Sequence, residues 1–194
     1  MVVFIKVKAL QNTKEQIINY LNLFLKNSDN YLHILPNTIP VDTISSCVVY
    51  DTEPAQLEKF PMVIISNGSS NVITGGIGGD FSSELYDSEG DLWGYRYGGM
   101  YDLSVTVEVA CRTVFEREFL TDLVLMALRV HLRRKLESIG ILIKDARTNG
   151  ESSVAINANK VYITTLTLSI WAEWYNVVEL TPIEDVNVNL NIRE

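Results

Sequence analysis

The clearest pattern of hydrophobic and polar positions runs from Tyr101 to Cys111, where the two kinds of residue alternate. The apolar positions are Tyr101, Leu103, Val105, Val107, Val109 and Cys111. A period of two places these side chains on one face of an extended chain. The stretch therefore predicts a β-strand with one buried face.

A helical pattern follows this strand. Thr113 lies three residues before Glu116, a spacing at which the two side chains can cap a helix start. Between Phe115 and Leu136 the apolar residues occupy more than one stripe, which predicts packing on two sides. They are Phe119, Leu120, Leu123, Val124, Met126, Ala127, Val130 and Leu132. Gly140 offers a left-handed stop, so we expect one continuous core helix.

A second helix is expected from Thr13 to Asn27. Asn12 or Thr13 can cap it, and its apolar stripe consists of Ile17, Leu21 and Phe24. Shorter apolar runs predict strands at residues 47–50, 62–65, 139–145 and 153–156, with a turn at 148–150. A long final strand has Tyr162, Leu166, Leu168, Ile170, Ala172 and Trp174 on its core face. We therefore predict an α/β (α+β) fold with a mainly antiparallel sheet packed by the two helices.

Residues 67–100 form an unusual segment that holds nine of the eleven glycines. So long a segment inside a compact domain is functional, disordered, or an extended hairpin that packs elsewhere. We favour an extended hairpin arm. The predicted organisation is then a single domain at residues 1–178, which includes this arm, and an extended C-terminal tail at 179–194.

Composition limits the class of function. The formal net charge of −8 argues against DNA binding over the whole surface, although a local basic patch stays open. No apolar run reaches the ~18 residues of a membrane span, and the first residues lack the features of a leader, so we expect a soluble protein without a membrane partner. Cys47 and Cys111 lie in apolar, strand-like surroundings and are expected to be core thiols.

Few residues suggest catalysis or ligand binding. The two histidines, His33 and His131, have no catalytic partner in the sequence, and Gly75–Gly79 is not followed by the Lys and Ser/Thr of a phosphate loop. Asp87, Glu89 and Asp91 have the alternate spacing of a calcium loop, but Gly98 stands where its final glutamate belongs. We therefore expect no catalytic, cofactor-binding or metal-ligating residues, no cofactor, and no enzymatic activity.

Two groups of residues are candidates for an interface. The first group is Trp93, Tyr95 and Tyr97 within the glycine-rich segment, because aromatic side chains often anchor protein contacts. The second group alternates with asparagines in the tail and consists of Val186, Val188, Leu190 and Ile192. Such a pattern favours pairing with a sheet edge, within the chain or on a neighbour. Candidate channel or rim residues are Asp80, Glu84, Asp87, Glu89 and Asp91.

The order of these elements resembles the tail terminator or tail-completion (neck) proteins of long-tailed bacteriophages. The resemblance covers Thr13 to Val178. It includes the first helix, the strand FPMVIIS at 60–66, the strand YDLSVTVEVACRT running into FEREFLTDLVLMALR, and the closing VYITTLTLSIWAEWY.

This resemblance implies a structural virion protein that assembles in the host cytoplasm into a homo-oligomeric ring, usually a hexamer. The implied partners are tail-tube and neck or connector proteins, with DNA passing through the lumen without specific binding. The small members of the family lack so long a glycine-rich arm and tail. Two other classes stay open: another virion connector or baseplate adaptor, and a cytoplasmic α/β ligand-binding domain in which residues 67–100 form a lid.

Overall fold

The computed structural model describes residues 3–5, 9–51, 59–73, 81–156 and 159–179 of the 194-residue chain. The chain divides into two compact units. The larger unit comprises Lys8–Ile73 and Met100–Trp174, and the smaller unit comprises Met1–Val7, Thr74–Gly99 and Tyr175–Glu194. Strands β5 and β7 contribute residues to both units.

The described strands form a seven-stranded sheet with the order β1-β7-β5-β3-β2, in which β4 also pairs with β5 and β6 with β7. Their bounds are β1 Val3–Ile5, β2 Val48–Asp51, β3 Met62–Ile73, β4 Phe81–Tyr86, β5 Leu92–Cys111, β6 Ile141–Ile156 and β7 Asn159–Glu179. The pairs β1–β7, β3–β5, β4–β5 and β6–β7 are antiparallel, and β2–β3 is parallel. The prediction of a mainly antiparallel sheet is confirmed.

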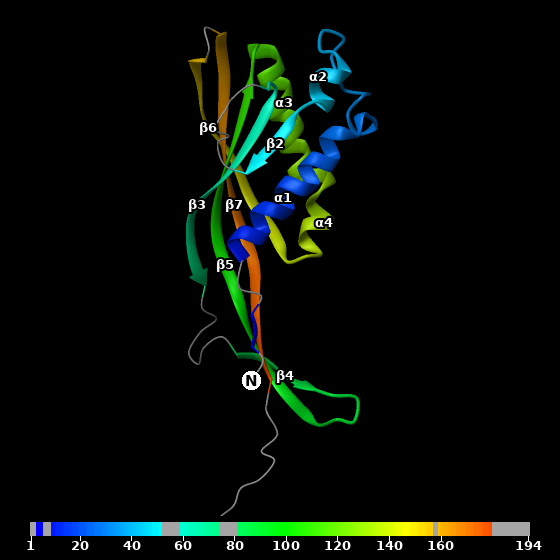
Figure 1. Ribbon diagram of the computed structural model, residues 1–194, viewed down its shortest axis with the longest axis vertical. Coiled ribbons are helices and arrows are strands. Elements are labelled where there is room, and N and C mark those ends of the chain that lie inside the picture. The colour runs from blue at the N-terminus through cyan, green and yellow to red at the C-terminus, as the bar shows by residue number, and fades with distance from the viewer. Residues whose placement is uncertain (1–2, 6–8, 52–58, 74–80, 157–158, 180–194) are drawn as a thin grey trace, which may run out of the picture. The chain divides into compact units, whose positions relative to one another are not determined.

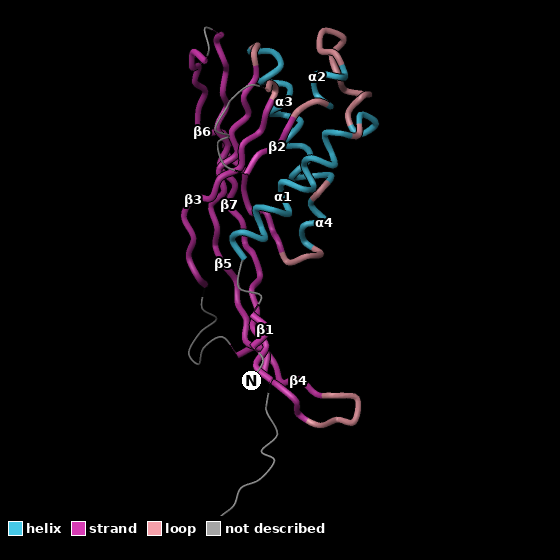
Figure 2. Tube along the Cα trace, in the orientation of Figure 1, coloured by secondary structure: helices cyan, strands magenta, loops and turns pink. Residues whose placement is uncertain are grey.

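Helices of the larger unit lie against one face of its strands (Figure 1). They are α1 Ala9–Lys26, the 3₁₀ turn Ser28–Asn30, α2 Val41–Ser45, α3 Val114–Met126, the π-turn Ala127–His131 and α4 Arg133–Glu137. Figure 2 shows the same separation of helices from strands. The predicted α/β (α+β) class is therefore confirmed.

The main core lies between these helices and the sheet. Every second residue of β5 from Leu103 to Val109 is buried there, together with Leu166, Leu168 and Ile170 of β7. Residues of α1 and α3 cover them from the helix side. The strand pattern at 101–111 thus identified the centre of the core, and β5 extends nine residues further toward the N-terminus than that pattern did.

The predicted core helix begins as expected but is not continuous. Thr113 accepts a hydrogen bond on its hydroxyl oxygen from the backbone N–H of Glu116 at 3.2 Å. After Met126 the helix widens into the π-turn, where the N–H of Leu132 donates to the carbonyl of Ala127 at 2.8 Å. The wide turn keeps Leu132 buried but points Val130 to solvent, so the assignment of Val130 to the core is wrong.

The start of α1 also differs from the prediction. The helix begins at Ala9, and Thr13 lies buried inside it instead of capping it. The adjacent Lys14 is also buried and forms an ion pair with Asp51 of β2. Packing against the sheet therefore determines the position of Thr13, and it outweighs the local hydrogen bonding from which the helix start was predicted. The predicted stripe of Ile17, Leu21 and Phe24 is confirmed as buried.

The predicted turn at 148–150 is wrong. Residues Ile141–Ile156 form one strand, β6, which pairs with β7 along its length. The pairing shifts register between Thr148 and Gly150, so the turn-forming residues are accommodated as an irregularity in the strand. None of the helices in the described part of the chain combines the length and the apolar character needed to cross a bilayer.

Candidate functional site

The glycine-rich region is divided between the two units. Residues 67–73 continue β3 in the larger unit, where Asn67 pairs with Val105 and Ile73 with Met100. In the smaller unit, β4 and the start of β5 form a hairpin in which Glu84 pairs with Tyr95. We call residues 81–97 the β4–β5 hairpin. It is the described part of the region in which an arm was predicted.

The tip of the hairpin is held by Asp87. Its Oδ1 accepts hydrogen bonds from the backbone N–H groups of Asp91 and Glu89, both at 2.9 Å. These N–H groups, with that of Asp91 contributing most, hold the pKa of the Asp87 carboxyl below its usual range. Gly90 has a φ of 90° in this turn, a conformation that favours glycine. Of the three carboxylates with calcium-like spacing, that of Asp87 thus holds a tight turn by accepting from the backbone of the other two residues.

Aromatic side chains of the hairpin are partly accessible to solvent. Trp93 is 37% exposed and lies where the β4–β5 register shifts, a position at which a strand can redirect a side chain. Tyr86, which the sequence analysis did not select, is 55% exposed and donates its hydroxyl hydrogen to Glu84. Tyr95 and Tyr97 are half-buried, so Trp93 and Tyr86 offer the larger accessible aromatic surface.

The structure describes most of the predicted acidic residues but not the predicted tail residues. Glu84, Asp87, Glu89 and Asp91 are all exposed and lie together around the hairpin tip. Asp80 and the tail residues Val186, Val188, Leu190 and Ile192 lie outside the described residues. Their roles at a rim or an interface stay predictions.

A groove in the larger unit lies between α1 and the segment that follows α3. It is lined by Tyr20, Leu23, Phe24, Asn27, Asn30, His131, Leu132 and Lys135. The Phe24 ring lies 5.2 Å from that of His131, and the side-chain amide of Asn30 donates to the carbonyl of Phe24 at 2.9 Å. We call this the α1/π-turn groove. The sequence analysis missed it, because it joins residues more than one hundred positions apart.

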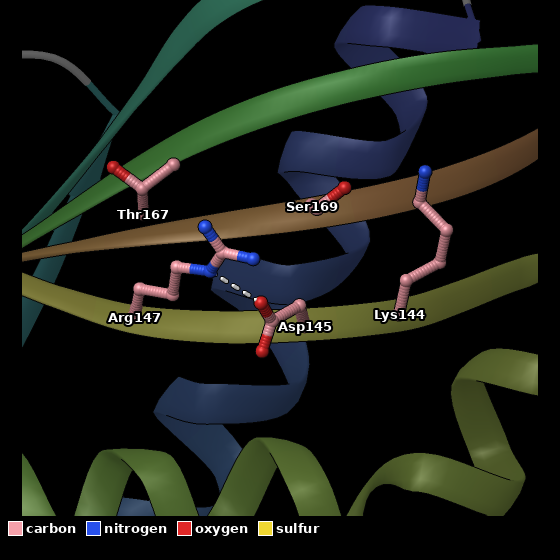
Figure 3. Close-up of a pocket in the computed structure, with 5 residues that line it drawn as sticks. All are labelled: Lys144, Asp145, Arg147, Thr167 and Ser169. Atoms are coloured by element: carbon pink, nitrogen blue, oxygen red, sulfur yellow. Dashed lines mark hydrogen bonds and ion pairs between the residues drawn. The ribbon is translucent and has the colours of Figure 1, made fainter.

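A second depression lies on the face of the larger unit's sheet away from the main core. Lys144, Asp145 and Arg147 of β6 line it with Thr167 and Ser169 of β7 (Figure 3). Arg147 Nε lies 2.5 Å from Asp145 Oδ2, and this bond holds the pKa of the Asp145 carboxyl below its usual range. Lys144 Nζ is 2.8 Å from Asp102 Oδ2. Both cations of the depression are therefore already paired with carboxylates.

The two thiols are unsuited to nucleophilic chemistry. Cys47 and Cys111 are both buried and unbridged. Burial raises the pKa of the Cys47 thiol to about 12 and also raises that of Cys111. Both groups are thus protonated near neutral pH. Among the described residues, no three His, Cys, Asp or Glu side chains come together in a way that could hold a metal ion.

The chain has structural similarity to known proteins among solved structures. No family model matches the chain, and the comparison with curated proteins gives no match. Among solved structures, the chain is similar to one in the "Virion of native gene transfer agent (GTA) particle", with 11% sequence identity and a TM-score of 0.26. The match covers 80% of this chain and 97% of the other. A superposition of this quality does not establish a common fold.

Proposed function

We propose that this protein is a structural component of a phage-type virion, which forms a ring that terminates the tail tube and joins tail to head. The observation that carries the proposal is the β4–β5 hairpin, a preformed element with accessible aromatic side chains in a unit separate from the main core. The two helices and three strands on which the sequence resemblance rests correspond to α1, α3, β3, β5 and β7. No enzymatic activity is part of the proposal.

The hairpin has the properties of an interface element. Its turn is fixed by hydrogen bonds to Asp87, so little conformational entropy remains to be lost at the tip on binding. Trp93 and Tyr86 offer large areas with few rotatable bonds, and such residues contribute strongly to protein interfaces. The surrounding carboxylates suit a wet rim or a channel wall.

A ring of about six copies follows from the family resemblance. Each contact in such a ring joins one surface of a protomer to a different surface of its neighbour. Repeating this heterologous contact around the ring closes it. The net charge of −8 suits a lumen through which DNA passes without phosphate-led binding. The proposed location is the tail or neck of the virion, next to tube and connector proteins, after assembly in the host cytoplasm.

Mass photometry and negative-stain electron micrographs of the purified chain test this proposal. We expect closed rings of about six copies, and we expect Tyr86→Ser/Trp93→Ser to weaken them without unfolding the subunit. The matched control is Val154→Ser, which removes an apolar side chain that is 48% exposed on β6. A chain that stays monomeric at high concentration and in the presence of tail-tube protein overturns the proposal, as does a ring unaffected by Tyr86→Ser/Trp93→Ser.

A further inference from the structure

Lys135 lines the α1/π-turn groove, and three more basic residues lie within six positions of it in this acidic protein. Residues 129–135 include Arg129, Arg133, Arg134 and Lys135, and all four side chains are exposed. Arg133 is 2.8 Å from Glu137, one turn later. Among the described residues, Arg134 and Lys135 form no ion pair. Lys135 in the groove wall and Arg134, next to it in sequence, are therefore available to an acidic partner.

Apolar side chains accompany these cations. Leu23 of α1 and Val130 of the π-turn are each 66% exposed, and Tyr20 and Phe24 form part of the groove wall. A DNA phosphate backbone gains nothing from such side chains, whereas a protein interface combines an apolar centre with charged groups at its edge. The surface thus favours a protein segment that carries both carboxylates and large apolar groups.

The β4–β5 hairpin has this combination. Glu84, Glu89 and Asp91 are exposed near its tip, and Asp87 holds the turn in shape. Tyr86 and Trp93 lie on the strands directly beside the turn and are both exposed. Its charge is opposite in sign to that of the groove, and its aromatic residues complement the groove's apolar ones.

We propose that the α1/π-turn groove of one copy receives the β4–β5 hairpin tip of a second copy. Carboxylates of Glu89 and Asp91 pair with Arg134 and Lys135, while Tyr86 and Trp93 cover Leu23 and Val130. The inference rests on the proposed ring and names the two surfaces that form its repeating contact. Since each copy carries one hairpin and one groove, the contact runs head to tail and can be repeated around a ring.

Charge reversal in two separate variants tests this contact. Variant one carries Arg134→Glu/Lys135→Glu, and variant two carries Glu89→Lys/Asp91→Lys. We expect either variant alone to associate roughly tenfold or more weakly than the unchanged chain, because like charges then face each other. An equimolar mixture restores association, since hairpin and groove are again opposite in sign at every contact. The control Lys59→Glu/Lys160→Glu makes the same charge change as variant one at exposed lysines that do not line the groove.

The outcomes separate this inference from the proposed function. If the unchanged chain forms rings and each charge-reversed variant on its own forms them equally well, the inference is overturned and the ring proposal stands. If the unchanged chain forms dimers or open oligomers without closed rings, and the two variants associate only when mixed, the contact is supported and the ring proposal fails. Absence of association in every sample overturns both. Loss of double-stranded DNA binding in variant one, with assembly unchanged, assigns the groove to nucleic acid and also overturns the inference.

Discussion

Replacing Leu123 by Asp abolishes cooperative folding. Leu123 is 1% exposed on α3 and lies in the main core between this helix and the sheet. An isolated carboxylate in such a place costs several kcal/mol, and the cavity left by the lost side chain adds about 2 kcal/mol or more. The total approaches the stability of a whole domain, about 5–15 kcal/mol.

Urea unfolding followed by circular dichroism measures this effect. The matched control is Val114→Asp on the same helix, where the residue is exposed and the first-turn position suits a negative charge. We expect the control to unfold cooperatively near the midpoint of the unchanged chain. A soluble Leu123→Asp protein with an unchanged near-ultraviolet spectrum shows instead that this face of α3 is not the core.

Replacing Glu151 by Ala destabilises the chain by about 2 kcal/mol, because it leaves a buried guanidinium poorly paired. Arg117 of α3 is 4% exposed, and its Nη2 lies 2.8 Å from Glu151 on β6 and 3.3 Å from Glu118. Its Nε is buried and has no hydrogen-bond partner among the described residues. The Glu151 carboxylate is largely exposed, so we expect less than the ~3–5 kcal/mol of a fully buried pair.

Two further variants test whether the lost contact with Glu151 and the unpaired charge of Arg117 cause this destabilisation. Glu118→Ala removes the longer of the two contacts, to a carboxylate that is about as exposed as that of Glu151, and is expected to cost about 0.5 kcal/mol. Arg117→Met in the Glu151→Ala background removes the buried charge and is expected to recover most of the loss in unfolding free energy. Equal effects of Glu151→Ala and Glu118→Ala in chemical unfolding contradict this account of the β6 contact.

Local sequence patterns predicted the parts of the fold that depend on local physics. The alternation at 101–111 and the Thr113 cap are short-range features, and both are present in the structure. The π-turn at 127–131 was not predicted, because one extra residue per turn adds no distinctive residue type to the pattern. The continuity of β6 was missed because pairing with β7 outweighed the turn preference of Thr148-Asn149-Gly150.

The same distinction applies to the candidate site. The hairpin could be predicted, because an Asp and a Gly at its tip fix the turn through neighbouring backbone groups. The α1/π-turn groove could not, because Phe24 and His131 meet only in the folded chain. Arg134 and Lys135 stand near the end of the predicted core helix, where cations complement the helix dipole, and that position gives no indication of a neighbouring groove.

Hydrogen exchange measured by mass spectrometry tests the central claim most directly, namely that the β4–β5 hairpin is an assembly surface. The chain is compared as diluted subunits and as concentrated assemblies, with peptides from α3 as the internal reference. We predict that backbone amides of residues 84–95 exchange at least tenfold more slowly in the assembly than in the folded subunit, while the reference stays unchanged. Equal protection of the hairpin in subunit and assembly contradicts the claim.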